Sequence, residues 1–397
     1  MEITLLDYSG FPGLSARYCI TYIWLTAKIS CIMLAIVLGT RPEIIKMSPI
    51  IRSCQKKDVD FFILHTGQHY SYEMDRVFFE ELDLPAPEFN LDVGSGSHSA
   101  QTGLIMTGIE KVLIREKPEV VLVQGDTNTV LAGTLAASKC SVTRGSSPQP
   151  IDVGHVEAGL RSFDRAMPEE VNRIVADHLS RYLFAPTQKA QEHLLCEGIP
   201  REKIHVTGNT IVDAVRENLA VSKKRADTIK DLGLSPDAYF LVTLHRQENV
   251  DNESRFRGIL EALTRIHEEH GMPLVFPVHP RTEKMIDSFG LKLKGFQLIK
   301  PLGFLEFLQL ESHARLALTD SGGVQEETCI LNIPCVTIRD STERPETVDA
   351  GANIIAGVDP AAITDAADRM LAHNRSWKNP FGDGKAGDRI VDIVSSR

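Results

Sequence analysis

The stretch IDVGHVEAGLRSFDRAMPEEVNRIVADH, residues 151–178, decides the fold of this chain. Its apolar start, Ile151 to His155, predicts a short buried strand, and a glycine-containing turn follows. Pro168 then begins a helix with Glu169 and Glu170 in its first turn, where acidic side chains complement the helix dipole. A strand, a turn and a helix in this order form the unit of a parallel sheet, whose ligands bind at the carboxyl ends of the strands.

Two carboxylates of this stretch are candidates for chemistry. Glu157 follows the strand directly and is flanked by small apolar residues, where a charge is costly unless it is used or paired. Glu169 reaches the same strand end from the helix, and two carboxylates at one cleft can divide acid and base roles. The alternative for Glu169 and Glu170 is an ordinary helix start.

The strand–helix pattern repeats on both sides of this stretch. Apolar runs predict strands over residues 33–38, 61–64, 120–123, 183–185 and 204–206 in the first half, and 239–244, 274–278, 296–299, 316–319 and 335–338 in the second. Such runs, alternating with helical segments, are typical of parallel sheets covered on both faces. We therefore predict an α/β fold with two doubly wound, Rossmann-type domains.

Four segments are expected along the chain. Residues 1–32 are an extension outside the core, residues 33–206 and 207–372 form the two domains, and residues 373–397 are a tail that packs back on the first domain. A membrane segment over the apolar residues 18–38 is the alternative for the extension. Lys28 interrupts that run, and the chain start lacks the basic residues of a signal peptide, so we predict no membrane association.

Composition narrows the class of protein. The net charge of −10 is unfavourable for nucleic acid, which we exclude as a partner. The seven cysteines are odd in number and scattered without a Cys-x-x-Cys pair, and no His-Glu-x-x-His pattern occurs. We therefore expect no metal site and a reducing, cytoplasmic location. The Ser- and Pro-rich residues 141–150 predict a surface loop without helix or strand.

A phosphate site is predicted where DSGGVQEE, residues 320–327, follows a strand and begins a helix. Gly322 and Gly323 let the backbone approach a phosphate, free amides supply donors, and Glu327 can reach ribose hydroxyls. The alternative is a plain glycine turn with Ser321 as the helix cap. Arg344 lies shortly downstream and favours the phosphate interpretation.

Further polar residues follow other strand ends. Arg41 and Lys46 lie near a helix start, where cations oppose the dipole unless an anion binds, although surface solvation remains the alternative. Asp126 is either functional or a helix cap, and His245 is either functional or a core histidine. No Gly-x-Gly-x-x-Gly follows the first strand, so a tightly held dinucleotide cofactor is not implied.

Nine motifs, in order, carry a resemblance to a known family. The motifs are GTRPEIIKMSP, TGQHY, QGDTNT, HVEAGLRS, MPEEVNR, TLHRQEN, PVHPRT, DSGGVQEE and RDSTERPE. Together they make the chain similar to the non-hydrolysing UDP-N-acetylglucosamine 2-epimerases from about residue 33 to about residue 372. The ordered set is highly specific, whereas any single motif is modest evidence.

The resemblance implies a GT-B-like fold with the active site in the interdomain cleft, and reversible epimerisation at carbon 2 of UDP-N-acetylglucosamine without a cofactor. It implies a homodimer and a second UDP-N-acetylglucosamine as activator. The implied catalytic residues are Asp126, Glu157, Glu169 and His245. The implied UDP-binding residues are Arg41, Lys46, Ser321, Gly322, Gly323, Glu327 and Arg344. The possible activator-site residues are Gln68, Glu170, Arg246 and His279.

Three other functions are compatible with parts of this pattern. A GT-B glycosyltransferase shares the fold and the Gly-Gly phosphate site but requires an acceptor. A hydrolysing epimerase releases the free sugar. A UDP-sugar-binding regulator keeps Ser321 and Arg344 but tolerates loss of the carboxylates. The sequence leaves open the scope for related sugars and which carboxylate acts on which face of the sugar.

Overall fold

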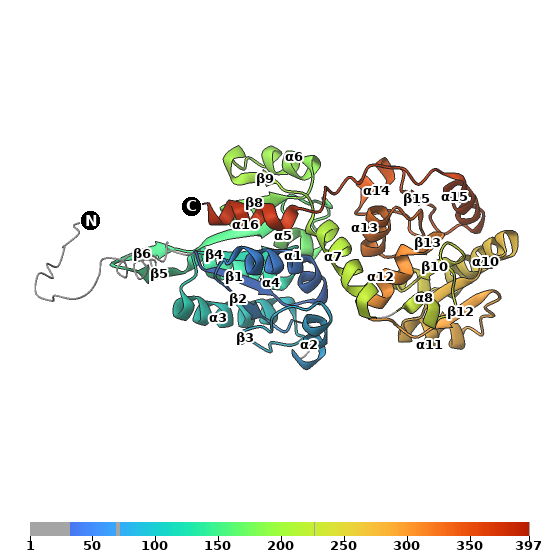
Figure 1. Ribbon diagram of the computed structural model, residues 1–397, viewed down its shortest axis with the longest axis horizontal. Helices are drawn as coiled ribbons and strands as arrows, with labels where there is room; N and C mark the ends of the chain where they lie inside the picture. Colours follow the sequence, from blue (N-terminus) through green and yellow to red (C-terminus); the bar gives the residue numbers. More distant parts are fainter. Residues whose placement is uncertain (1–31, 69–71, 226, 397) are drawn as a thin grey trace, which may run out of the picture.

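The computed structural model describes residues 32–68, 72–225 and 227–396. These residues form two parallel sheets, one of seven strands and one of six, each covered by helices (Figure 1). The predicted fold class of two doubly wound α/β units is thereby confirmed. The predicted extension lies outside the described residues except for residue 32.

The seven-stranded sheet has the order β3-β2-β1-β4-β7-β8-β9, and all its neighbouring strands pair in parallel. Its strands are β1 (Leu34–Leu38), β2 (Phe61–His65), β3 (Phe89–Asn90), β4 (Val120–Gln124), β7 (Asp152–Val156), β8 (Tyr182–Ala185) and β9 (Ile204–Val206). Every residue of β1, β4 and β7 is buried, as expected for strands with helices on both faces.

The six-stranded sheet has the order β12-β11-β10-β13-β14-β15, again parallel throughout. Its strands are β10 (Phe240–Thr243), β11 (Leu274–Pro277), β12 (Phe296–Ile299), β13 (Leu316–Thr319), β14 (Cys335–Thr337) and β15 (Asn353–Ile355). The sequence missed β3, whose two residues give no readable hydrophobic pattern, and β15, whose three residues begin with the polar Asn353.

Helices connect the strands. In the first half they are α1 (Arg41–Lys57), α2 (Tyr72–Glu81), α3 (His98–Glu116), α4 (Asn128–Lys139), α5 (Pro168–Leu179), α6 (Gln188–Cys196) and the 3₁₀ turn η1 (Arg201–Lys203). In the second half they are α8 (Thr228–Asp231), α9 (Gln247–Val250), α10 (Glu253–His270), α11 (Pro280–Ser288), α12 (Phe304–Ser312), α13 (Gly322–Leu331), α14 (Pro345–Asp349) and α15 (Pro360–Ala372). Pro168 begins α5 as predicted, and Thr127 caps α4 through its side chain.

Two helices join the halves. Helix α7 (Thr210–Arg225) lies between the sheets and packs against α1 on one side and against α12 and α13 on the other (Figure 1). The chain then returns: α16 (Ala386–Ser395) lies against α1, and Ile390, Val391 and Val394 join the core cluster of β1 and α1. We propose that the domain boundary falls in the loop before α7 and that the tail belongs to the first domain.

The prediction for residues 141–150 is wrong. They form an antiparallel hairpin of β5 (Ser141–Arg144) and β6 (Ser147–Pro150), which projects from the body of the molecule (Figure 1). Gly145 adopts a left-handed φ of 65° in its turn, and Arg144 ties the hairpin to the carbonyl oxygen of Lys117 at 3.1 Å. The Gly- and Ser-rich sequence therefore correctly indicated a turn, but the residues on both sides of the turn pair as strands despite their poor strand propensity.

No helix in the described part of the chain is long and apolar enough to cross a membrane. The five cysteines that the structure describes are all free, four of them buried and Cys196 exposed.

Candidate active site

A cleft of about 930 Å³ lies where the carboxyl ends of the two sheets face each other. One wall comes from the loops after β1, β4 and β7 and from the first turn of α5. The other wall comes from the amino terminus of α13 and from the loop before α14. Nine of the predicted residues line this cleft: Lys46, Asp126, Glu157, Glu169, Arg246, Ser321, Gly322, Gly323 and Arg344.

Glu157 is the most constrained acid of the cleft. It has a left-handed φ of 71°, which is strained for a residue with a side chain. Lys46 donates to both carboxylate oxygens, at 2.7 and 2.9 Å, and Asn209 donates at 3.2 Å. Burial alone would raise the pKa of Glu157, but Lys46 and Arg344 outweigh it, so the pKa lies below its ordinary value. The carboxylate is therefore held ionised in a fixed orientation.

Asp126 follows β4 and is partly exposed to the cleft, and Arg173 forms an ion pair with its carboxylate. Thr127, not Asp126, caps α4 with its side chain, so the cap interpretation of Asp126 is wrong. Glu169 lines the cleft from the first turn of α5. The structure thus brings the three predicted catalytic carboxylates to one wall.

His245 follows β10 at the border of the cleft and does not itself line it, whereas its neighbour Arg246 does. Its Nδ1 lies 2.6 Å from Oδ1 of the buried Asp320, which also accepts from the backbone amides of His245 and Arg246. Burial alone would raise the pKa of Asp320, but the contacts with His245 outweigh it and keep the carboxyl ionised. Since the carboxylate accepts from Nδ1, the Nε2 atom of His245 faces away from it.

Asp320 is a site residue that the sequence did not single out. The signal was present, because β10 and β13 pair in parallel with Thr243 opposite Thr319. An acid and a histidine that follow the ends of two paired strands must come together. That pairing could have been inferred once the strand order was known.

The opposite wall offers an anion site. Ser321 occupies the N-cap position of α13, as in the alternative of a plain glycine turn, but its side chain makes no cap hydrogen bond, and the helix amides face the cleft. Around Gly322 the space is open, since a Cβ there would meet only Glu343, at 3.9 Å. Arg344 lines the cleft beside this turn.

Two predicted UDP-binding residues, Arg41 and Glu327, are not among the residues that line the cleft. The guanidinium of Arg41 lies over the ring of Phe78, 4.7 Å from its centroid. Glu327 is half-buried and lies close to the Gly-Gly turn, since a Cβ on Gly323 would come within 3.9 Å of its Oε1. Burial and the neighbouring Glu326 raise the pKa of the Glu327 carboxyl, although Glu311 and Lys46 act in the opposite direction.

Among the four possible activator-site residues, only Arg246 lines the cleft. Gln68 is buried and accepts from the backbone amide and the hydroxyl of Thr129, at 3.0 and 2.7 Å. Glu170 is buried and accepts from the loop before α5. His279 is exposed and caps α11. These contacts give Gln68 and Glu170 structural roles within the first half of the chain.

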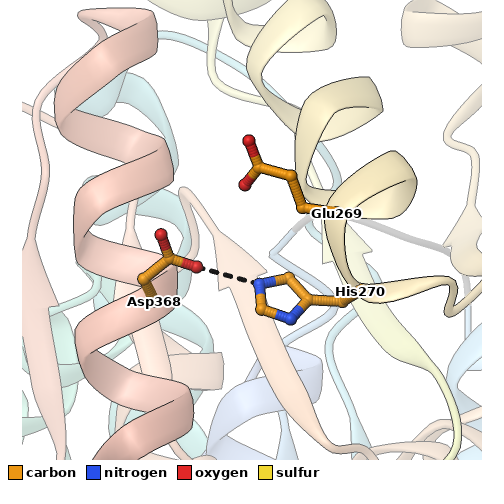
Figure 2. Close-up of side chains that lie close together, drawn as sticks. All are labelled: Glu269, His270 and Asp368. Atoms are coloured by element: carbon orange, nitrogen blue, oxygen red, sulfur yellow. Dashed lines mark hydrogen bonds and ion pairs between the residues drawn. The ribbon is translucent and has the colours of Figure 1, made fainter.

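One further group of side chains has the composition of a metal site. Glu269, His270 and Asp368 gather between α10 and α15, and Nε2 of His270 lies 2.9 Å from Oδ1 of Asp368 (Figure 2). All three are exposed, and none of them lines the cleft. Exposed acidic groups of this kind are common without an ion, so we assign it no role.

Fold and cleft together define a class of protein. Two Rossmann-type units that face each other across a cleft, with acids on one wall and a helix amino terminus and arginine on the other, are the architecture of GT-B-like enzymes. Comparison with known proteins narrows the class to one family. A profile of the family described as UDP-N-acetylglucosamine 2-epimerase matches residues 52–395.

Individual relatives agree with this match. The chain is 55% identical to a UDP-N-acetylglucosamine 2-epimerase of Methanocaldococcus jannaschii, over 91% of this chain and 98% of that one. A crystal structure of the M. jannaschii enzyme in complex with UDP-GlcNAc and UDP superposes with a TM-score of 0.79 at 54% identity, covering 92% of this chain and 100% of that one. A UDP-2,3-diacetamido-2,3-dideoxy-D-glucuronate 2-epimerase of Pseudomonas aeruginosa is 40% identical, over 90% of this chain and 98% of that one.

The chain therefore belongs to the UDP-N-acetylglucosamine 2-epimerase family, whose members are isomerases. The family resemblance that the nine motifs predicted is confirmed.

Proposed function

We propose that this protein interconverts UDP-N-acetylglucosamine and UDP-N-acetylmannosamine without releasing the sugar. The observation that carries the proposal is the opposition of Glu157, held ionised by Lys46, to the open Gly322-Gly323 turn across one cleft. Membership of the family supports the substrate class.

The chemistry follows from the acidity of the substrate. The hydrogen on carbon 2 is not acidic, so its removal requires departure of UDP from the neighbouring anomeric carbon. Breaking both bonds gives a 2-acetamidoglucal and bound UDP. Lys46, Arg344 and the amides of α13 would stabilise the leaving diphosphate, which lowers the barrier to its departure.

Inversion then requires proton transfer on both faces of the sugar. One acidic side chain of the wall formed by Asp126, Glu157 and Glu169 removes the proton, and another group returns a proton to the opposite face before UDP adds back. Enclosure of the cleft between the two sheets favours re-addition over loss of the glycal, because the diphosphate remains among cations.

Incubation of the purified protein with UDP-N-acetylglucosamine in deuterated water tests this function. We expect UDP-N-acetylmannosamine with deuterium at carbon 2 and no requirement for NAD or an acceptor. Product without the label would contradict the mechanism. Free UDP with a glycosylated acceptor would identify a transferase, and free N-acetylmannosamine a hydrolysing epimerase.

A parallel incubation with UDP-2,3-diacetamido-2,3-dideoxy-glucuronate addresses the sugar scope, since a relative at 40% identity bears that name. We expect UDP-N-acetylglucosamine to be the better substrate, because the relative at 55% identity is named for it. A higher kcat/KM for the diacetamido sugar would reverse the assignment.

Three further expectations belong to the same proposal: a homodimer, a second UDP-N-acetylglucosamine that activates, and a cytoplasmic location. The family resemblance supports the first two, and the scattered, free cysteines support the third. Light scattering tests the dimer. The rate of the forward reaction, measured against the concentration of UDP-N-acetylglucosamine, tests the activator, and we expect a sigmoidal dependence.

A further inference from the structure

Glu326 is a buried acid for which neither the motifs nor the predicted reaction provides a role. It lies in α13, one residue before Glu327, and its side chain is only 3% exposed. Its Oε1 lies 2.8 Å from Nε of Arg344, and its Oε2 lies 3.8 Å from Nζ of Lys46. Lys46 comes from α1 in the first half of the chain, whereas Arg344 precedes α14 in the second. One carboxylate thus contacts a cation from each side of the cleft.

The four charged groups form an alternating row across the cleft. Glu157 contacts Lys46, Lys46 contacts Glu326, and Glu326 contacts Arg344. Two carboxylates balance two cations, which satisfies the rule that buried charges must be paired. Burial alone would lower the pKa of Lys46, but Glu157 and Glu326 outweigh it and keep the ammonium charged.

The position of Glu326 has two opposite effects on a diphosphate. It fixes the two cations that line the cleft at a set separation, so they need no reorganisation when the leaving group develops charge. It also repels any anion bound between them, since like charges a few ångströms apart interact strongly in a partly buried site. A group whose only role was to bind UDP tightly would not place a carboxylate there.

We propose that Glu326 is a positioning residue that aligns Lys46 and Arg344 across the cleft for departure of the diphosphate, while weakening the binding of free UDP. This inference rests on the proposed function, because it assumes that the two cations contact the diphosphate. Glu326 would therefore stabilise the transition state of the departing diphosphate but destabilise the complex with free UDP.

The alternative is that Glu326 only stabilises the packing of α13 against the rest of the chain. The two interpretations differ in the sign of one measurement. A packing residue, when replaced, loosens the site and weakens UDP binding together with the rate. A positioning residue of the proposed kind, when its charge is removed, tightens UDP binding and lowers the rate.

The test compares Glu326→Gln, which preserves the shape and removes the charge, with the full-length wild-type protein. Calorimetric titration with UDP and the kcat of epimerisation are the two readouts. We expect UDP to bind about three- to tenfold more tightly and kcat to fall about tenfold. UDP binding that is unchanged or weaker would overturn the proposal, and so would an unchanged kcat.

A second variant keeps the test decisive if Glu326→Gln does not fold. Glu326→Asp retains the charge but withdraws it from Lys46, so we expect UDP affinity within about twofold of wild type and a kcat about tenfold lower. A wild-type kcat for this variant would overturn the proposal. Glu261→Gln, a matched change at an exposed residue of α10, serves as the control that alters neither readout.

Failure of the proposed function is distinguishable from failure of this inference. If the wild-type protein does not place deuterium at carbon 2, the epimerase proposal fails whatever the variants do. If the wild-type protein epimerises normally and Glu326→Gln does not bind UDP more tightly, only the inference fails.

Discussion

Nδ1 of His155 lies 2.7 Å from Oδ1 of Asp177, and Nε2 of the same ring lies 2.7 Å from the carbonyl oxygen of Gly125. Both ring nitrogens therefore face acceptors, which requires both to carry a proton. His155 and Asp177 are completely or almost completely buried, and Arg161 contacts the second oxygen of Asp177 at 2.7 Å. A charged histidine thus connects β7, α5 and the turn that carries Asp126.

His155→Gln should destabilise the protein by about 3 kcal/mol, because it leaves Oδ1 of the buried Asp177 without its charged partner. Burial alone would lower the pKa of His155, but Asp177 outweighs it and raises the pKa above its ordinary value. The stabilisation is therefore fully present below the unfolded pKa, near pH 6.5, and is lost as the pH rises through the folded pKa. Thermal melts of both proteins from about pH 6 to about pH 9 measure it.

The difference in Tm between wild type and His155→Gln should shrink toward alkaline pH. A difference that is constant across this range would show that the ring is neutral in the folded protein. His373→Gln, at an exposed histidine, provides the matched control and should melt like wild type.

Glu157→Gln should abolish most of the epimerisation while the fold remains intact. Gln can still accept one hydrogen bond from Lys46, but it can neither remove nor return a proton at carbon 2. We expect kcat to fall about a thousandfold, with an unchanged Tm and UDP binding at least as tight as in wild type. The measurement is the rate at which solvent deuterium is incorporated at carbon 2, which should be lost in the variant. An incorporation rate within about tenfold of wild type would exclude Glu157 from proton transfer.

Much of this fold could be predicted because parallel strands buried on both faces give continuous apolar runs, as in LAIVL of β1 and VVLVQ of β4. A strand of two residues, such as β3, carries no such signal. The β5–β6 hairpin was missed because its pairing depends on Gly145 and on the anchor of Arg144, not on strand propensity.

The candidate site divides in the same way. Residues at the ends of strands, such as Asp126 and Glu157, could be predicted because topology alone places them at the cleft. Glu326 could not be assigned, because its partner Lys46 is distant in sequence, and Asp320 could be paired with His245 only once the strand order was known. Arg41 and Glu327 were expected to bind UDP, but neither is among the residues that line the cleft, because Arg41 lies over Phe78 and Glu327 is half-buried.

Asp213→Asn should stabilise the protein at neutral pH. Asp213 is buried in α7, and its Oδ1 accepts from the amide of Gly387 at 3.0 Å, an interaction that Asn preserves. Burial raises the pKa of Asp213 to about 6, although the amides of α16 offset part of this effect. The folded state thus binds the proton more strongly than the unfolded state, so stability falls as the pH rises from about 4 to about 6 and stays lower above it.

Asn at position 213 carries no charge, so Asp213→Asn removes this loss of stability. We expect its free energy of unfolding to exceed that of wild type by about 2 kcal/mol at about pH 7.5. Chemical denaturation at several pH values measures it. The gain should disappear as the pH falls below about 4, the ordinary pKa of Asp, because the wild-type carboxyl then becomes protonated in both states. A variant that is less stable than wild type at neutral pH would show that Asp213 is paired more strongly than its contacts indicate.

Glu169 and Glu170 are adjacent in α5 but should respond oppositely to the same substitution. Glu170 is buried and accepts from the backbone amides of Ser162 and Phe163, each at 3.0 Å, and from Arg173 at 2.6 Å. Glu170→Gln turns an amide toward these donors, so we expect a loss of about 2 kcal/mol in stability. Glu169 lines the cleft, and Glu169→Gln should leave Tm unchanged while lowering kcat about a hundredfold.

The pH dependence adds a second check on Glu170. Burial alone would raise its pKa, but the amides of Ser162 and Phe163 outweigh it, so the pKa lies below its ordinary value. The stabilisation is therefore present above the unfolded pKa and is lost as the pH falls through the folded pKa. The Tm difference between wild type and Glu170→Gln should narrow in acid. If Glu170→Gln instead keeps the wild-type Tm and changes only activation by excess UDP-N-acetylglucosamine, Glu170 belongs to an activator site and not to the structural clamp on this loop.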